Sequence, residues 1–325
     1  MTVQPIELPQ QRPVADGALF PLVLTPEAEG VTRESALSWV KDNAADLKKR
    51  MERHGAILFR GFPFEEAEDF EAMLDAAEFE NMPYVGGAAP RQNITSRRVL
   101  TANESPPSEP IPFHHEMAQV PNPPGYVFFY CVTPPETGGE TAIGHSNRVY
   151  ERFRSINPIF AREVERKGVR YIRVMPDQDD RASAIGRSWR STFLTDDRDE
   201  AESKMRDLGT SWEWLPNGDL RTETATVPAI RVEPRTGMKT FFNSIVAAYT
   251  GWTDSRNDPR KAVCCGDGAP VDEDSVLATA EAMEEEAVAI PWQRGDVLWV
   301  DNSLVLHARR PFAGARKILA SIAIR

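Results

Sequence analysis

The sequence predicts a mainly β fold with flanking helices, arranged as a sandwich or a barrel. From about residue 80 onward, short strand-like runs alternate with clusters of Pro, Gly and Asn, which is typical of these folds. The first 80 residues follow a different pattern, which predicts helix, strand and helix. The chain has 325 residues, 41% of them hydrophobic, so it can bury a substantial core.

Apolar residues recur at spacings of three and four in two N-terminal segments, which predicts amphipathic helices. Gly55 stands where the first of them should stop, and the run AILF after it is typical of a buried strand. The elements expected here are a loose arm or edge strand over residues 1 to about 15, one helix from Ser35 to about His54, a strand at 56–59 and a helix at about 65–77.

Beyond residue 80 we expect strands at GYVFFYCV, RYIRV, VPAIRV, KTFFN, DVLWV and KILASIAI. One acidic helix, from about Glu273 to Ala287, interrupts them. Two polar segments, about 175–190 and 251–272, are too long for simple turns. They are either lids and binding loops or solvated surface insertions.

Charge and cysteine content restrict the partners and the compartment. The formal net charge of −11 would repel a polyanion, so nucleic acid is not an expected partner. Three cysteines without C-x-x-C spacing indicate a reducing compartment. No signal-like N-terminus and no apolar run of the roughly 20 residues needed for a membrane span is present, so we expect a cytoplasmic protein without a membrane partner.

Two adjacent histidines and a glutamate stand in the stretch FHHEMAQV. On an extended segment, residues i and i+2 face the same way, so His114 and Glu116 can converge on one metal ion while His115 points elsewhere. Had His115 been the ligand, its partner would be Met117, a poor ligand for an oxygen-activating iron. Two imidazoles and one carboxylate leave coordination positions open on iron(II), so a second histidine is required.

The remaining histidines are His54, His145 and His307. His54 stands beside a glycine at a predicted helix end, where a cation interacting with the helix C-terminus is the better explanation. His145 follows a predicted turn. His307 is presented by an apolar segment after a polar turn, in GDVLWVDNSLVLHARRPF, and is the favoured third ligand.

Basic residues follow His307 closely. The far carboxylate of a dicarboxylate co-substrate requires a guanidinium fork, which binds it in bidentate geometry. Arg316 begins the last predicted strand and is expected to face the site. Arg309 and Arg310 are expected at the surface or behind the ligands.

Many blocks of the sequence carry a resemblance to one superfamily, among them GAILFRGFP, PYVGGAAPR, IPFHHEMAQVP, GGETAI, IPWQRGDVL and DNSLVLHARRPF. In this order they resemble the taurine dioxygenase and clavaminate synthase-like superfamily of iron(II)- and 2-oxoglutarate-dependent oxygenases. The similarity covers nearly the whole chain. It is greatest to the branch of plant and bacterial clavaminate synthase-like proteins that includes syringomycin-type hydroxylases.

The resemblance implies a double-stranded β-helix, a distorted jelly roll, with Fe(II) at one mouth held by His114, Glu116 and His307. One dioxygenase domain would span residues 1–325, with 1–80 as its helix-strand-helix part and 81–325 as the jelly-roll core with insertions. The implied reaction consumes 2-oxoglutarate and O2, hydroxylates an unactivated C–H bond, and releases succinate and CO2.

The family's residues for the far carboxylate of 2-oxoglutarate fall on Thr141 in GGETAI and on Arg316. The interval from His307 to Arg316 is shorter than in many relatives, which leaves Lys317 and Arg325 as alternatives for the arginine role.

The resemblance further suggests an amino acid as the substrate, either free or tethered to an aminoacyl carrier protein. Loops at the metal mouth would bind it, and we expect Trp189 in the pocket lining. The polar candidates on these loops are Arg91, Asn103, Arg187, Asn243 and Ser244.

Two other classes of protein fit parts of the pattern. A zinc hydrolase also uses histidines and a glutamate, although H-E-x-x-H is absent and the surroundings of the motif are β-rich. A non-catalytic jelly roll that binds a sugar or another small molecule would contain the histidines only as structural residues.

Overall fold

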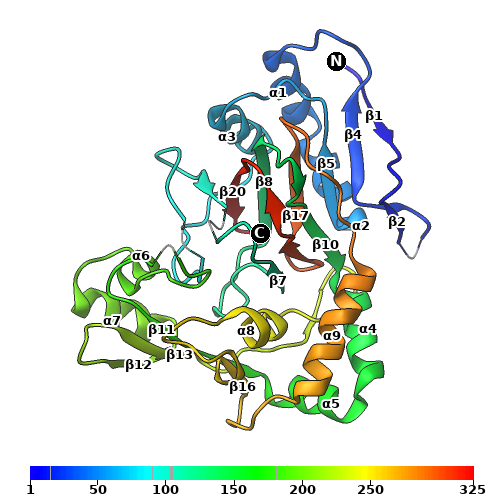
Figure 1. Cartoon of the computed structure of the whole chain (residues 1–325). Coiled ribbons are helices and arrows are strands. Elements are labelled where there is room, and N and C mark those ends of the chain that lie inside the picture. Colours follow the sequence, from blue (N-terminus) through cyan, green and yellow to red (C-terminus); the bar gives the residue numbers. More distant parts are fainter. Residues whose placement is uncertain (15, 90, 103–104, 181) are drawn as a thin grey trace.

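Two facing β-sheets form the centre of the computed structural model, which describes residues 1–14, 16–89, 91–102, 105–180 and 182–325 (Figure 1). The larger sheet has seven strands in the order β1 (Val3–Ile6), β4 (Leu22–Pro26), β5 (Ala56–Phe59), β17 (Val297–Asp301), β8 (Tyr126–Thr133), β20 (Lys317–Ala323) and β6 (Leu100–Thr101). The smaller sheet has the order β10 (Thr141–His145), β18 (Val305–Arg309) and β7 (Ile111–His114).

Side chains alternate across β8 and so serve both faces of the larger sheet. Val127 and Phe129 belong to the core cluster that also contains Ile143 of β10, so this face packs on the smaller sheet. Phe128 and Tyr130 pack with the N-terminal helices on the opposite face. The run GYVFFYCV is therefore apolar throughout because both of its faces are buried.

Three helices cover the outer face of the larger sheet: α1 (Arg33–Asp42), α2 (Ala44–His54) and α3 (Ala67–Ala76). The sequence predicted one helix where α1 and α2 stand, and that prediction was wrong. The helix breaks at Asn43, whose backbone N–H and side-chain amide both donate to the Trp39 carbonyl oxygen. The apolar spacing continues across the break because both helices pack on the same sheet.

A second layer of elements lies below the two sheets in Figure 1. Its sheet has the order β12 (Ser211–Trp214), β13 (Leu220–Glu223), β11 (Val169–Met175) and β16 (Val263–Cys265). Its helices are α4 (Ser146–Ile156), α5 (Pro158–Lys167), α6 (Trp189–Phe193), α7 (Arg198–Asp207), α8 (Ile245–Gly251), the short 3-10 helix η1 (Pro259–Lys261) and α9 (Glu273–Glu286).

The predicted acidic helix is confirmed as α9, but the sequence analysis missed α4 to α8. Helix α4 buries Val149, Tyr150 and Phe153, residue types that also favour strands. Helix α7 buries only Ala201 and Met205, too few to produce a clear helical period. Tertiary packing, rather than the local pattern, establishes these helices.

The predicted strands were found with different lengths. RYIRV and DVLWV lie in β11 and β17, whereas VPAIRV and KTFFN contribute only a two-residue pair. The short paired strands are β14 (Arg231–Val232) with β15 (Lys239–Thr240), β2 (Arg12–Pro13) with β3 (Leu19–Phe20), and β9 (Thr137–Gly138) with β19 (Phe312–Ala313). The predicted N-terminal edge strand is β1.

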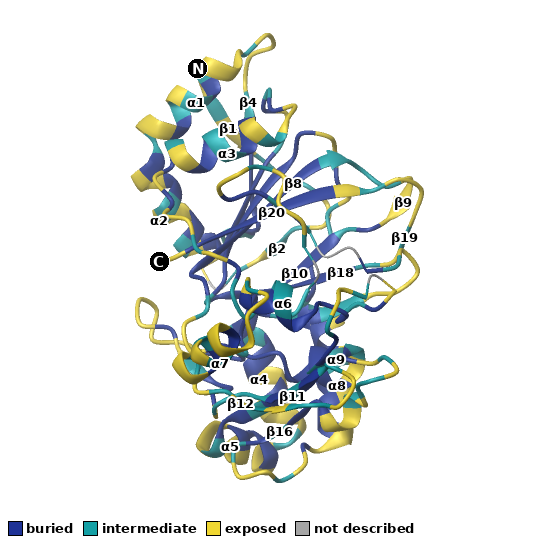
Figure 2. Cartoon of the chain, turned by 90° about the vertical axis from the view of Figure 1, so that its left-hand side faces the viewer, coloured by how far each residue is buried: buried dark blue, intermediate teal, exposed yellow. Residues whose placement is uncertain are grey.

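Burial follows this architecture. In Figure 2 the strands of the two facing sheets are mostly buried, while exposed residues gather on the outer helices and on the loops. None of the helices in the described ranges combines the length and apolarity that a bilayer crossing requires.

The end of α2 packs closely against β10, β17 and β18 at Gly55. Gly55 has φ +76°, and a Cβ there would lie 2.7 Å from Val305 Cγ2 and 2.8 Å from His145 Cε1. Its carbonyl oxygen accepts from the backbone N–H of Asp301 at 3.0 Å. This position therefore requires glycine for both its conformation and its close packing.

We expect Gly55→Ala to lower the free energy of unfolding by about 1–3 kcal/mol more than Gly237→Ala, because a core clash adds to the left-handed backbone cost. Gly237 is the matched control: its φ is +69° and nothing lies within 4 Å of the built Cβ. Urea denaturation of both variants measures the difference. Equal losses would show that packing at this junction contributes nothing.

Candidate active site

A cavity of about 300 Å³ is lined by residues of β7, β8, β10 and β18 and by the end of α8. Both long polar segments of the sequence also reach it. Ala184 and Ile185 come from the first segment, and Gly251, Trp252 and Thr253 begin the second. These parts of the two segments therefore line a binding cavity rather than solvated surface.

His114, Glu116 and His307 meet at one wall of this cavity. His114 ends β7 and lies directly opposite His307 on the paired strand β18. The two rings are 4.4 Å apart at their centroids, and His307 Nε2 lies 3.5 Å from Glu116 Oε2. One ligand atom from each residue can be chosen so that all three lie within 4.8 Å of one another, close enough to hold one ion.

The protonation of these groups suits a divalent metal. His114 Nδ1 lies 2.8 Å from the Pro112 carbonyl oxygen, which can only accept, so Nδ1 carries the proton and Nε2 keeps its lone pair. Burial lowers the pKa of His114 to about 4, with a further contribution from His307, so the ring is neutral at pH 7. Burial opposes ionisation of Glu116, but the charge of Arg91 and contacts with His307 hold its pKa well below the usual range.

The other two histidines outside the motif lie away from the cavity. His54 Nδ1 lies 2.6 Å from the Leu19 carbonyl oxygen, at the end of α2 as predicted. His145 is the last residue of β10 rather than a residue just after a turn, and its ring packs 4.2 Å from Phe20.

His115 is completely buried and points away from the metal ligands, as the period-two argument predicted. Its Nδ1 lies 2.6 Å from the Asn302 carbonyl oxygen and its Nε2 lies 2.8 Å from Ser146 Oγ. Its ring stacks on Phe242 at 4.4 Å. Both nitrogens are occupied, so His115 is a packing residue.

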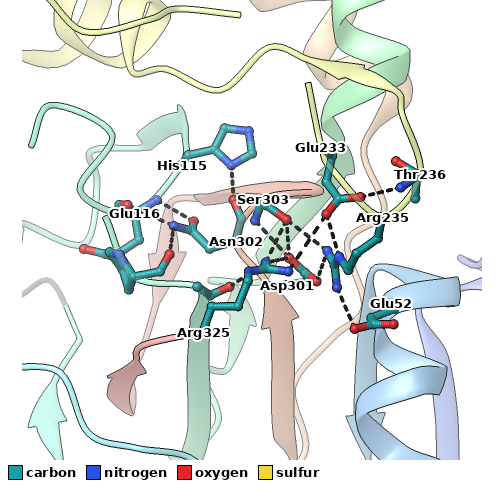
Figure 3. Close-up of polar contacts among 12 residues, drawn as sticks. Glu52, His115, Glu116, Glu233, Arg235, Thr236, Asp301, Asn302, Ser303 and Arg325 are labelled. Atoms are coloured by element: carbon teal, nitrogen blue, oxygen red, sulfur yellow. Dashed lines mark hydrogen bonds and ion pairs between the residues drawn. The ribbon is translucent and has the colours of Figure 1, made fainter. Parts of the chain in front are cut away.

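Asn302 fixes the position of Glu116, as Figure 3 shows. Its Oδ1 accepts from the Glu116 N–H at 2.9 Å, and its Nδ2 donates to the Glu116 carbonyl oxygen at 3.1 Å. The same amide donates to the Pro124 carbonyl oxygen at 2.8 Å. The turn after β7, which contains Glu116, and the turn between β17 and β18 are thereby held in one geometry.

The neighbouring Asp301 is fully buried and holds two guanidinium groups (Figure 3). Arg235 Nη2 lies 2.7 Å from its Oδ2, and Arg325 Nη2 lies 2.6 Å from its Oδ1. Arg235 also pairs with Glu233 and Glu52. Arg325 therefore belongs to this network and does not line the cavity.

Arg316 and Thr141 both line the cavity. Arg316 Nε donates to the Gly139 carbonyl oxygen at 2.9 Å, while its terminal nitrogens have no partner among the described residues. Burial lowers the pKa of Arg316 to about 10, with the charge of Arg309 adding to the effect, so it remains a cation at pH 7. Lys317 is exposed at the start of β20.

Arg309 was expected at the surface or behind the ligands, and the surface part of that prediction was wrong. It is 6% exposed and lines the cavity, because it stands two residues after His307 on β18 and so faces the same side. Its guanidinium donates to the carbonyl oxygens of Ser105 and Pro106 at 2.9 and 2.8 Å. Arg310 is half exposed and pairs with Glu284.

The structure separates the candidate substrate residues. Arg91 and Ser244 line the cavity. Arg187 is buried against carbonyl oxygens, Asn243 donates to the Ala229 carbonyl oxygen, and Trp189 packs on Trp214, all outside the cavity lining; Asn103 lies outside the described residues. The sequence analysis also missed Tyr84 and Gln119 as lining residues.

Comparison with known proteins agrees with this geometry. A family model described as taurine catabolism dioxygenase TauD, TfdA family matches residues 18–322. The chain belongs to the TauD, TfdA family. It is 48% identical over 321 residues to a clavaminate synthase-like protein of Arabidopsis thaliana, covering 97% of this chain and 96% of that protein.

More distant matches extend the comparison. The dapdiamide synthesis protein DdaC of Enterobacter agglomerans is 29% identical over 280 residues, which is 82% of each protein. The crystal structure of PvcB from Pseudomonas aeruginosa matches with a TM-score of 0.57 at 16% identity, over 100% of this chain and 91% of that one. The expected double-stranded β-helix is therefore confirmed.

The chain is an Fe(II)/2-oxoglutarate-dependent dioxygenase of the TauD family. Two imidazoles and an ionised carboxylate at a cavity wall fit Fe(II) and leave positions for further ligands. With 2-oxoglutarate and O2, the bound iron supplies the oxidising chemistry. The family assignment decides against the zinc hydrolase and the non-catalytic binding protein.

We expect His114→Ala to abolish Fe(II) binding and His115→Ala to retain it. Of these two adjacent histidines, only His114 presents a free lone pair to the metal site. Removing the His115 ring takes its partner from the Asn302 carbonyl oxygen and from the Ser146 hydroxyl, at a cost of about 1–3 kcal/mol each. The visible band of the anaerobic protein with Fe(II) and 2-oxoglutarate measures the first effect, and denaturation measures the second. A normal band in His114→Ala would contradict the assignment, and His307→Ala provides the positive control for loss.

Proposed function

We propose that the protein hydroxylates an unactivated C–H bond of an amino acid or an amino-acid-derived molecule, with release of succinate and CO2. The observation that supports this proposal is the buried Arg91 side chain, which lies beside the metal ligand Glu116. Its charge is suited to a substrate carboxylate. A relative named for dapdiamide synthesis is consistent with action on a small biosynthetic molecule. Three free cysteines are consistent with a reducing compartment such as the cytoplasm.

Arg91 has capacity for a second anion. Its Nη2 donates to Glu116 Oε2 at 2.9 Å, and its guanidinium lies 4.3 Å above the Tyr84 ring. Its Nε and Nη1 are buried without a hydrogen-bond partner among the described residues. Because a buried unsatisfied guanidinium is costly, each of these two nitrogens is suited to donate to an oxygen of a substrate carboxylate.

The polar groups around Arg91 suit the rest of an amino acid. Ser244 and Gln119 line the same cavity and carry oxygen acceptors for an ammonium group. Most of the remaining lining is apolar, which suits a side chain and excludes water from the reacting carbon. An aminoacyl thioester on a carrier protein has no free carboxylate, so Arg91 favours the free amino acid over the carrier-bound form.

A second cation of the cavity, Arg316, is available for the co-substrate. We infer that Arg316 and Thr141 bind the far carboxylate of 2-oxoglutarate, since both line the cavity and the terminal nitrogens of Arg316 are available. This arrangement would place the two anions at separate cations. The protein then orients both molecules at the iron, which is its main contribution to the rate.

We expect Arg316→Met to raise the KM for 2-oxoglutarate roughly ten- to hundredfold, because a hydrogen bond to a charged group contributes about 1.5–3 kcal/mol. Lys317→Met is the matched control, since Lys317 is the adjacent cation but is exposed outside the cavity. Steady-state succinate release at varied 2-oxoglutarate measures both. An equal change of the KM for 2-oxoglutarate in the two variants would show that Arg316 does not bind its far carboxylate.

The proposed reaction is tested by a substrate screen scored by succinate release above the uncoupled background. We expect free amino acids to stimulate release, and their methyl esters and carrier-bound aminoacyl forms to stimulate it at least tenfold less. Stimulation by carrier-bound forms alone would overturn the role of Arg91. No stimulation by any amino acid derivative would overturn the proposed substrate class.

A further inference from the structure

A second, smaller cavity of about 50 Å³ adjoins the one that contains the metal ligands. Gln119 and Trp252 line both cavities and so form the wall that they share. The smaller cavity is lined in part by Arg173 and by four threonines: Thr192, Thr210, Thr222 and Thr224. A space of this size accommodates one carboxylate group or a few water molecules.

Arg173 is a buried cation without a paired anion. It lies on β11 and is 6% exposed, and the one hydrogen bond of its guanidinium to a described residue runs from Nη2 to Thr192 Oγ1 at 3.1 Å. No carboxylate in the described ranges forms an ion pair with it. The pKa of Arg173 is lowered to about 10 by burial and by the nearby Arg187, so it is still charged at pH 7.

The buried Arg98 of this chain shows what a compensated cation looks like. Its Nη1 lies 3.1 Å from Asp75 Oδ1 and donates to the Phe79 carbonyl oxygen at 2.8 Å. The acid whose charge favours Arg173 is Asp254, but that carboxylate already accepts from Arg256 at 2.6 Å and Ser183 at 3.0 Å. An unpaired buried charge costs several kcal/mol in general, so its position on a cavity wall indicates an anionic ligand.

The hydroxyl groups in the cavity complete such a site. Thr192 Oγ1 is fixed by Arg173, and the Thr222 hydroxyl donates to the Arg173 carbonyl oxygen at 3.3 Å. Among the described residues the lining includes no carboxylate, so none of them repels an anion. One guanidinium and neighbouring hydroxyls make up a donor set suited to a carboxylate.

We propose that this cavity is a subsite for a carboxylate at the far end of the primary substrate, bound by Arg173 and Thr192. The inference rests on the proposed function and narrows it to amino acids that carry a second acid group. The carboxylate of the amino-acid group would bind Arg91, and the distal carboxylate would reach Arg173. The carbon chain between them would pass beside Gln119 and Trp252, the residues that line both cavities.

Binding of chain-matched probes tests the subsite without turnover. The protein is loaded anaerobically with Fe(II) and 2-oxoglutarate and titrated calorimetrically with 2-aminoadipate, 2-aminopimelate and 2-aminosuberate. The matched monoacids are norleucine, 2-aminoheptanoate and 2-aminooctanoate. We expect at least one diacid to bind tenfold or more tightly than its monoacid, because only the diacid supplies the anion for Arg173.

Variants then assign that preference to Arg173. Arg173→Met should abolish it and Arg173→Lys should retain part of it, while the visible band with 2-oxoglutarate reports that the iron site of each variant is intact. Arg221→Met is the matched control, since Arg221 lies on the paired strand β13 with a side chain 39% exposed. It should preserve the preference.

The results that overturn the subsite are distinct from failure of the proposed function. Equal binding of diacids and monoacids, absence of binding by both, or a preference that survives in Arg173→Met would each overturn the subsite. Monoacids that stimulate succinate release as well as diacids would retain the proposed reaction and overturn the subsite alone. Tight diacid binding without stimulated succinate release would support the subsite and overturn the proposed reaction.

Discussion

The hydrogen bonds of the Asn302 amide hold the active site together. The amide bonds both backbone polar groups of Glu116, and the Asn302 carbonyl oxygen accepts from His115. Because all of these atoms are buried, each unmade bond would carry its full desolvation cost. The turn after β17 thus sets where the H-x-E segment lies, and β18 then delivers His307 opposite His114.

Cations line both cavities, although the whole chain has a net charge of −11. Glu116 is the carboxylate that pairs with Arg91, while Arg316 and Arg173 face cavities without a paired carboxylate among the described residues. Such cations are costly until anions arrive. These uncompensated charges therefore favour anionic ligands. The net negative charge of the chain does not oppose this at short range, because water and salt screen surface charges.

Much of the metal site could be predicted from the sequence because its geometry is local. The period of two on an extended segment separates His114 from His115 without knowledge of the fold. The same rule predicts that Arg309, two residues after His307, lies on the cavity wall. Arg187 and Asn243 lie outside the cavity lining, and a sequence does not show that their side chains donate to backbone carbonyl oxygens.

By itself the sequence determined the apolar strands, the acidic helix α9, and the residue types that bind the metal, because each depends on periodicity or on side-chain chemistry. Only the tertiary structure decided which of three histidines completes the triad geometrically, that Arg325 stabilises Asp301 rather than a co-substrate, and that Arg173 lies at a cavity. These outcomes depend on contacts between residues far apart in the chain. Such contacts are fixed by how sheets and helices pack, and packing leaves no short-range pattern in the sequence.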